Sequence, residues 1–157
     1  MGEVVPLPSS ASALDMAGDV AANIDALKTE LLKMEQAEPE TKSIFHGGMY
    51  CRQVFFKAGF LVVGKVHKRE HFFFVASGTL LVTTDDGPQN MVGPQMVCSP
   101  PGTRRAVYAQ TDVLCMTFHK TDATTVEEAE LDLVEEDLSS PFTADNTLRP
   151  PLIEVLS

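Results

Sequence analysis

The sequence predicts a mainly β protein that folds as an antiparallel barrel or jelly roll. Residues 43–119 contain at least six short segments rich in Val, Phe, Tyr, Leu and Thr, and clusters of turn-forming residues separate them. This part of the chain shows no alternation of strands with helices, so a parallel sheet with crossover helices is not expected. So many short strands within about 75 residues are typical of two antiparallel sheets closed on one another.

The strands can be placed from their composition and from the turns between them. The strand segments are MYCRQVFF, GFLVVGKV, HFFFVASGTLLVTT, QMVCS, RAVYA and VLCMTF, and the turns are KAG, KRE, DDGPQ, PPGT and QTD. Asp85, Asp86 and Gly87 indicate a hairpin turn, since the alternating oxygen ligands of a calcium loop are missing. Phe72, Phe73 and Phe74 are consecutive in a strand and cannot share a face, which favours core packing over base stacking.

The segments on either side of the barrel are expected to contain one helix each. We divide the chain into an N-terminal arm and helix over residues 1–42, a barrel over 43–121 and an acidic helix with a tail over 122–157. Residues 1–18 read as an extended arm, and the last segment, RPPLIEVLS, reads as an edge strand or a clasp on a neighbour. Residues 19–36 are expected to form a helix with an apolar stripe made of Val20, Ile24, Leu27, Leu31 and Met34. The stripe packs either on the core or on a second copy of the chain. Thr125 and Glu128 form a capping box for an acidic helix over 126–138.

Charge is distributed unevenly along the 157 residues, whose net charge is −10. Residues 43–121 contain eight basic and four acidic side chains, a net +4, and the flanks contain four basic and eighteen acidic ones, a net −14. The overall charge argues against general nucleic-acid binding. No apolar run is long enough to span a membrane, and the N-terminus lacks the pattern of a secretory signal. An odd number of cysteines, three, favours a reducing compartment, so a cytoplasmic location is expected.

The stretch GKVHKREHFFFVASG, residues 64–78, and the later PPGTRR carry a resemblance to a known family. They resemble the two motifs of the cupin superfamily, G-x5-H-x-H-x3-E-x6-G and G-x5-P-x-G-x2-H-x3-N, whose members are small jelly-roll barrels. Anchoring the first motif on Gly78 places Lys65, His67 and His71 where the family has His, His and Glu. In the second motif, Pro100 and Gly102 match, and Arg105 occupies the position of the last histidine. The resemblance therefore implies a cupin-like barrel whose usual metal ligands are partly replaced.

These replacements suggest an anion-binding pocket more strongly than a metal site. Lysine and arginine are cations at neutral pH and do not ligate a metal, so no cofactor is expected. If a divalent metal binds, the remaining route uses His67 and His71 with His119 or His46. An anionic small molecule would instead be held at one mouth of the barrel, where the alignment brings five basic residues together: Lys65, Lys68, Arg69, Arg104 and Arg105. His67 and His71 can donate hydrogen bonds to the same anion. The residues expected to bind the ligand are Lys65, His67, His71, Arg104 and Arg105. The alternative is that these cations bind the protein's own acidic flanks or are solvated.

Residues 45–135 also resemble small cupin-like proteins encoded by tailed bacteriophages, which implies a phage or bacterial setting, either the host cytoplasm or the virion. Three functions stay open. The barrel binds a small anion without turning it over, or acts as a metal-dependent cupin enzyme through His67 and His71, or serves as a structural or virion-associated interaction protein. The absence of a full ligand set leans away from an enzyme. The unpartnered helix stripe and the two arms predict a homo-oligomer, with a dimer favoured.

Overall fold

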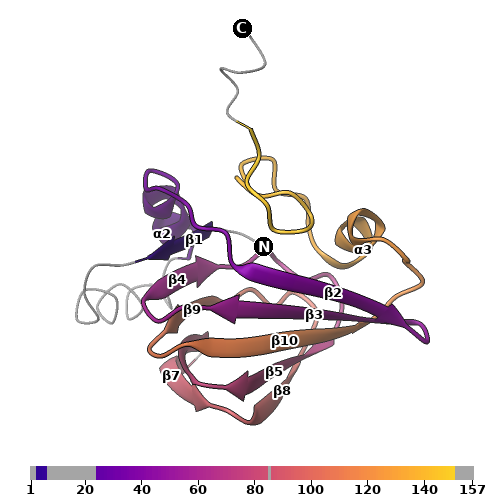
Figure 1. The fold of residues 1–157 in the computed structure, drawn as a ribbon, viewed down its shortest axis with the longest axis horizontal. Coiled ribbons are helices and arrows are strands. Elements are labelled where there is room, and N and C mark those ends of the chain that lie inside the picture. Colours follow the sequence, from indigo (N-terminus) through magenta and orange to yellow (C-terminus); the bar gives the residue numbers. More distant parts are fainter. Residues whose placement is uncertain (1–2, 7–23, 85, 151–157) are drawn as a thin grey trace, which may run out of the picture.

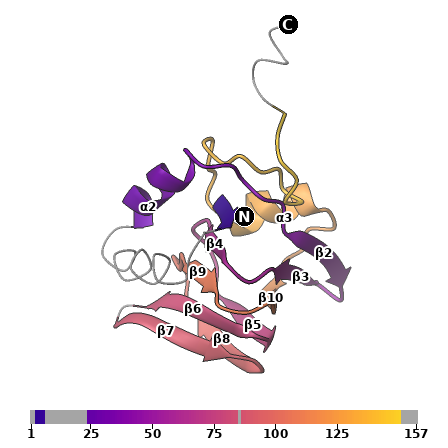
Figure 2. The same ribbon diagram turned by 60° about the vertical axis from the view of Figure 1, so that its left-hand side comes forward.

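Two five-stranded antiparallel sheets face each other and form a jelly-roll barrel (Figures 1 and 2). The computed structural model describes residues 3–6, 24–84 and 86–150. Sheet A contains, in spatial order, β1 (Glu3–Pro6), β4 (Phe60–Val63), β9 (Ala106–Ala109), β6 (Thr79–Thr84) and β7 (Gly87–Val92). Sheet B contains β2 (Glu40–His46), β3 (Met49–Phe56), β10 (Val113–Lys120), β5 (His71–Ser77) and β8 (Gln95–Ser99). The mainly β, antiparallel fold class predicted from the sequence is confirmed.

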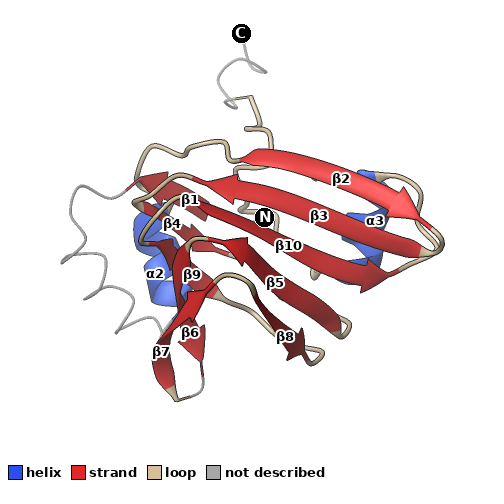
Figure 3. Ribbon diagram, turned by 60° about the horizontal axis from the view of Figure 1, so that its bottom comes forward, coloured by secondary structure: helices blue, strands red, loops and turns tan. Residues whose placement is uncertain are grey.

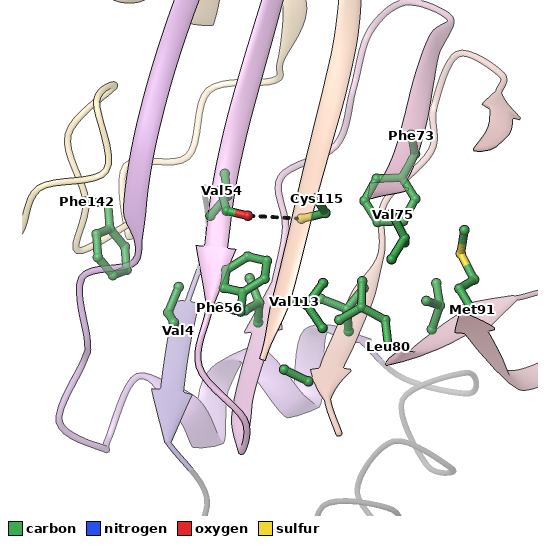
Figure 4. Close-up of a cluster of buried hydrophobic side chains, with 14 residues drawn as sticks. Val4, Val54, Phe56, Phe73, Val75, Leu80, Met91, Val113, Cys115 and Phe142 are labelled. Carbon is green, nitrogen blue, oxygen red and sulfur yellow. Dashed lines mark hydrogen bonds between the residues drawn. The ribbon is translucent and has the colours of Figure 1, made fainter. Parts of the chain in front are cut away.

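The core lies between the two sheets and consists of the side chains that point inward from alternate positions of the strands. Sheet B contributes buried side chains that include Val54, Phe73 and Val75, and sheet A contributes others such as Leu80 (Figure 4). The alternation of buried and exposed positions along β5 shows that Phe73 faces inward while Phe72 faces out. The three consecutive phenylalanines therefore divide between the two faces of sheet B, as the sequence predicts.

Helix α2 (Ile24–Leu31) covers the outer face of sheet A. Its Leu27 and Leu31 pack on a second apolar cluster formed by outward residues of β1, β4 and β9, so this part of the predicted stripe packs within the subunit. The helix was expected to run to residue 36 but ends at Leu31. The side-chain amide of Gln36 donates a hydrogen bond of 2.8 Å to the Leu31 carbonyl, which ends the helix in place of another turn. Residues 19–23 lie outside the described part of the chain.

Helix α3 (Val126–Leu133) begins where the capping box predicts and ends earlier than expected. The Thr125 hydroxyl accepts a hydrogen bond from the Glu128 amide at 3.2 Å. The helix was expected to extend to residue 138, but Val134 adopts an extended conformation and forms an antiparallel bridge with His67. The end of α3 is thereby tied to the loop that follows β4 (Figure 3).

Three strands were not among the segments predicted from the sequence: β1, β2 and β7. Strand β2 precedes the first predicted segment, MYCRQVFF, and pairs with β3. Strand β1 lies within the predicted extended arm and pairs with β4, from Glu3 opposite Val63 to Pro6 opposite Phe60. Strand β7 was assigned in part to a turn because Gly87, Pro88, Gln89 and Asn90 do not alternate in polarity; it is the exposed edge strand of sheet A. Residues 7–18 and the tail from 151 onward lie outside the described residues, as does Asp85. Among the described helices, none is long and apolar enough to cross a membrane.

Candidate ligand-binding site

A cavity of about 150 Å³ lies between the sheets and is closed on one side by α3. Its two ends differ in chemistry. The apolar end is lined by Val54, Phe56, Val62, Phe73, Val107 and Cys115, and the polar end by Arg52, Lys65, His67, His71, Arg105 and His119. Ala129, Glu130 and Leu133 of α3 also contribute to the wall. The cavity can therefore enclose a small molecule with one polar and one apolar end.

The polar end is assembled by two loops whose backbones bind each other. The His67 amide donates to the Thr103 carbonyl at 3.0 Å, and the Gly102 amide donates to the His67 carbonyl at 2.8 Å. The loop after β4 is thus joined to the PPGT turn, as the two sequence motifs imply. His71 begins β5 opposite Ser99, and His119 enters from β10 opposite Tyr50.

Three imidazole rings meet in this cavity. The ring centroids of His67 and His71 are 4.2 Å apart, those of His71 and His119 are 4.9 Å apart, and those of His67 and His119 are 5.5 Å apart. Burial lowers the pKa of His67 and of His119 to about 3, and each is lowered further by the neighbouring His71. The pKa of His71 is also lowered, chiefly by burial. All three rings are therefore neutral at pH 7.

The geometry of the rings does not fit a metal ion. Their planes are inclined by only 9° to 30°, so the in-plane lone pairs lie in separate, nearly parallel planes and do not converge on one point. The Nε2 atom of His119 is also hydrogen bonded to the Thr117 hydroxyl at 2.9 Å. Over the described residues, no group of three or more His, Cys, Asp or Glu side chains is arranged to hold a metal. His46, on the exposed edge strand β2, is not among the residues that line the cavity.

Arg105 is the main positive charge of the polar end. Its guanidinium donates to the Ser99 hydroxyl at 2.6 Å and lies 4.8 Å from the centroid of the Phe73 ring. Burial lowers the pKa of Arg105, which means that the surroundings do not compensate the desolvation of the charge. Among the described residues, no carboxylate lies within 4 Å of this guanidinium. A partly buried arginine in this state can bind an anion that enters the cavity.

The other cations predicted to form the site are bound by acidic or carbonyl groups of the flanks. Lys65 lines the cavity but pairs with Glu130 of α3. Arg69 pairs with Asp132, and the Lys68 ammonium donates to the Leu131 carbonyl at 2.8 Å. Arg104, expected in the ligand site, lies elsewhere and pairs with Asp25 of α2. Of the five basic residues predicted to converge on one mouth, Lys65 and Arg105 line the cavity, and Lys68, Arg69 and Arg104 do not. All of them except Arg105 bind groups of α2 or α3.

Arg52 is a cavity residue that the sequence-based reasoning missed. It faces inward from β3, donates to the Asn146 side-chain carbonyl, and its positive charge helps to lower the pKa of His119. The strand pattern contained the signal, because Tyr50, Arg52 and Val54 alternate on one face and the other two are buried. Glu130 was read only as part of an acidic helix, and nothing in the sequence links it to Lys65.

Comparisons with known proteins show a distant similarity of this fold to solved structures, and they show no relationship at the level of sequence. No protein-family model matches the sequence, and no curated protein does. Among solved structures, a cupin superfamily protein from Desulfitobacterium hafniense is similar with a TM-score of 0.46 and 16% identity, over 59% of this chain and 88% of that one. The Cupin_2 domain of an XRE family transcriptional regulator from Enterobacter cloacae is similar with a TM-score of 0.45 and 16% identity, over 52% of this chain and 95% of that one. A putative acetylacetone dioxygenase from Methylibium petroleiphilum is similar with a TM-score of 0.47 and 13% identity, over 54% of this chain and 63% of that one.

The fold and the site together define a class of protein, the small antiparallel jelly-roll barrel with an internal cavity. The sheet order and the cavity between the sheets carry this assignment, since the similarities to solved structures are distant. Structural neighbours of this chain are cupin superfamily proteins. The resemblance to phage-encoded proteins and the dimer stay predictions.

Proposed function

We propose that this barrel is a binding module for a small organic anion, held in the cavity by Arg105 without metal catalysis. The observation that carries the proposal is the partly buried Arg105 guanidinium, which has no carboxylate partner among the described residues. The histidines of the cavity are neutral, and its Lys65 ammonium is already paired with Glu130. Arg52 adds a second cation, which donates a hydrogen bond to the neutral side-chain amide of Asn146. A carboxylate would meet the planar guanidinium in its preferred bidentate geometry.

The size and polarity of the cavity narrow the class of ligand. An apolar cavity of about 150 Å³ in another protein takes up benzene, so a cavity of this volume accommodates about six non-hydrogen atoms. Phe56, Val62 and Val107 offer a hydrocarbon surface away from the cations. A short carboxylate with an aliphatic body satisfies both ends. A bare inorganic anion would leave the apolar end empty.

The pH dependence expected from the sequence is changed by the structure. If the histidines were imidazolium ions, binding would weaken as the pH rose through about 6.5. The pKa of His67 and of His119 is about 3, so only the arginines among these groups carry charge in the free cavity above pH 6. We therefore expect the affinity for a carboxylate to be flat between pH 6 and pH 8.

A metal-dependent enzyme is the second candidate, and the three neutral imidazoles favour it because neutral imidazole is the form that binds metals. The nearly parallel rings and the adjacent Arg105 charge oppose it. Elemental analysis of untagged protein separates the two. Stoichiometric iron, manganese, nickel or zinc would support the enzyme, and protein free of these metals that still binds carboxylates would support the binding module.

The proposal is tested by calorimetric titration at pH 7 with butanoate, inorganic phosphate and butylammonium. Butanoate should bind, phosphate should bind more weakly because it has no apolar body, and butylammonium should not bind because its charge is repelled. Arg105→Met should abolish the difference between butanoate and butylammonium, and Arg104→Met, outside the cavity, should preserve it. Equal binding of the anion and the cation by the unmodified protein would overturn the proposal. The cytoplasm of a phage host, or a phage particle, stays the predicted setting.

A further inference from the structure

One buried polar atom in the cavity has no hydrogen-bond partner among the residues that the structure describes. His71 is 6% exposed and lines the polar end, and its Nε2 atom makes no hydrogen bond. Its other ring nitrogen, Nδ1, lies 3.2 Å from the Arg69 carbonyl oxygen. A carbonyl oxygen can only accept, so Nδ1 must carry the proton and donate. In the neutral ring Nε2 is then a lone-pair acceptor, and burying it without a donor is costly.

The nearby protein groups do not supply that donor. His119 directs its Nε2 to Thr117, and the Arg105 guanidinium donates to Ser99, at 2.9 Å and 2.6 Å respectively. The ammonium of Lys65 is paired with Glu130. The acceptor on His71 is therefore left for a molecule inside the cavity. A carboxylate cannot fill this role at neutral pH because it has no hydrogen to donate, whereas a hydroxyl group can.

We infer that the ligand is a short hydroxycarboxylate, whose carboxylate binds Arg105 and whose hydroxyl donates to His71 Nε2. The inference rests on the proposed function and adds the hydroxyl group to it. It also separates two roles in the cavity. Arg105 provides affinity for any small carboxylate, and His71 provides selectivity for the hydroxylated one. Selectivity of this kind is strong when a buried polar group of the site would otherwise stay unpaired.

Paired ligands test the inference on the full-length protein. Butanoate is compared at pH 7 with 2-hydroxybutanoate and 3-hydroxybutanoate, because the structure fixes the two protein groups but not the carbon that carries the hydroxyl. At least one hydroxy acid should bind about 10-fold or more tightly than butanoate, the factor that one satisfied buried hydrogen bond supplies. In His71→Phe, which keeps a ring but removes the acceptor, the ratio of the affinity for the hydroxy acid to that for butanoate should fall to less than about 2-fold, whatever the change in the affinity for butanoate itself.

The outcomes distinguish this inference from the proposed function. If butanoate and both hydroxy acids bind with equal affinity, the hydroxyl inference is overturned and the anion site stands. If no carboxylate binds, the proposed function falls as well. A preference that persists in His71→Phe also overturns the inference, since the hydroxyl then has another partner. Should His71→Phe fail to fold, nitrogen NMR of labelled His71 in the unmodified protein gives the same answer, because the Nε2 resonance must shift on adding the hydroxy acid but not on adding butanoate.

A second, independent observation concerns the outer face of sheet B. Outward side chains form an apolar row that crosses all five strands in register: Ile44, Cys51, Phe118, Phe72 and Cys98. Phe72 and Met96 on this face are 47% and 49% exposed. Helix α2 covers the corresponding face of sheet A, but no described helix or loop covers this one (Figure 3). The two outer faces are both apolar, and only one is shielded.

We propose that this face binds the same face of a second copy of the chain. Its charged residues are Glu40, Lys42 and Lys120 at the margins, a net +1, on a chain whose net charge is −10. Two copies can therefore meet here without the repulsion that other surfaces would create. Five strands of about seven residues cover on the order of 600 Å², so a pair buries about 1,200 Å², the lower bound of stable interfaces.

Sedimentation velocity between 1 and 100 µM tests this pairing. The unmodified protein should be a dimer, and Phe72→Glu should weaken association at least about 100-fold, because two-fold symmetry buries the new carboxylate twice. Val92→Glu, at an exposed position of sheet A, should leave the dimer intact. Maleimide labelling of the exposed Cys98 should slow as the protein concentration rises, which tests the face even if Phe72→Glu misfolds. A monomer at 100 µM, or a dimer that survives Phe72→Glu, overturns the proposal and leaves this face to a different partner.

Discussion

Replacing Arg105 with methionine should separate ligand binding from stability. One charge-assisted hydrogen bond contributes about 1.5–3 kcal/mol, so the affinity for a carboxylate should fall by roughly 10- to 100-fold. The effect on folding should be small because opposing contributions nearly cancel. The substitution removes the 2.6 Å bond to the buried Ser99 and the contact with Phe73, together about 1–2 kcal/mol, and it also removes a desolvated charge. A methionine of similar length fills the space, so the free energy of unfolding should change by less than about 1 kcal/mol.

The assay pairs two measurements on the same preparation. Calorimetric titration with butanoate gives the affinity, and urea unfolding monitored by circular dichroism gives the stability. Arg105→Lys distinguishes a bidentate contact from a simple charge, because lysine keeps the charge but loses the planar fork, and it should restore only part of the affinity. Unchanged binding together with a loss of more than about 2 kcal/mol of stability would refute the reasoning, since Arg105 would then be a structural residue.

Three further predictions follow from the buried charges and the tight turn. Between pH 7 and pH 5 the protein should lose about 2 kcal/mol of stability for each of His67 and His119, whose pKa is about 3. The reason is that these histidines bind protons below pH 6.5 in the unfolded chain but not in the folded one. His67→Gln should make the free energy of unfolding, measured with urea, depend less steeply on pH. Glu130→Gln leaves the buried Lys65 ammonium unpaired, so it should cost about 2 kcal/mol and tighten carboxylate binding several-fold, whereas the exposed Glu127→Gln should do neither. Gly78→Ala should cost more than about 3 kcal/mol, because the glycine has φ +86° and a Cβ would lie 2.1 Å from the Asp112 carbonyl oxygen, whereas Gly48→Ala has φ +75° but open space and should cost about 1 kcal/mol.

Each of these has a result that would contradict it. A flat stability between pH 7 and pH 5 would mean that the imidazoles take up protons as readily in the folded protein as in the unfolded chain. Weaker carboxylate binding in Glu130→Gln would show that Lys65 does not reach the cavity once it is released. Equal costs for Gly78→Ala and Gly48→Ala would mean that the turn after β5 adjusts its backbone freely.

The sequence predicts the barrel well because strand alternation and turn residues are local signals. It predicts α3 at its start, where Thr125 and Glu128 are three residues apart, but not at its end, which is set by a bridge between Val134 and His67 across the fold. Strand β7 is missed since an exposed edge strand needs no apolar alternation.

For the candidate site too, the sequence predicts what depends on local spacing and misses contacts between distant parts of the chain. The motif spacing correctly places Lys65, His67, His71 and Arg105 around one cavity. It leaves open whether His119 or His46 joins them, and it does not reveal that Glu130 neutralises Lys65, because those pairings join distant parts of the chain. The uneven charge was visible in the sequence, and the structure gives its physical cause: acidic side chains of α2 and α3 are the counterions of the barrel's cations.

The attachment of α3 has a consequence for the speed of ligand exchange. The helix closes one side of the cavity and packs on Tyr50 through Ala129 and Leu133. It is also held by three contacts to charged groups, from Lys65, Lys68 and Arg69. Added salt screens such contacts where they are exposed, and the Arg69 side chain is 54% exposed. A ligand that enters on this side must wait for the helix to undock, so entry and exit should both accelerate with ionic strength. The residence time of a ligand would then depend on the salt of its surroundings as well as on the fit of the cavity.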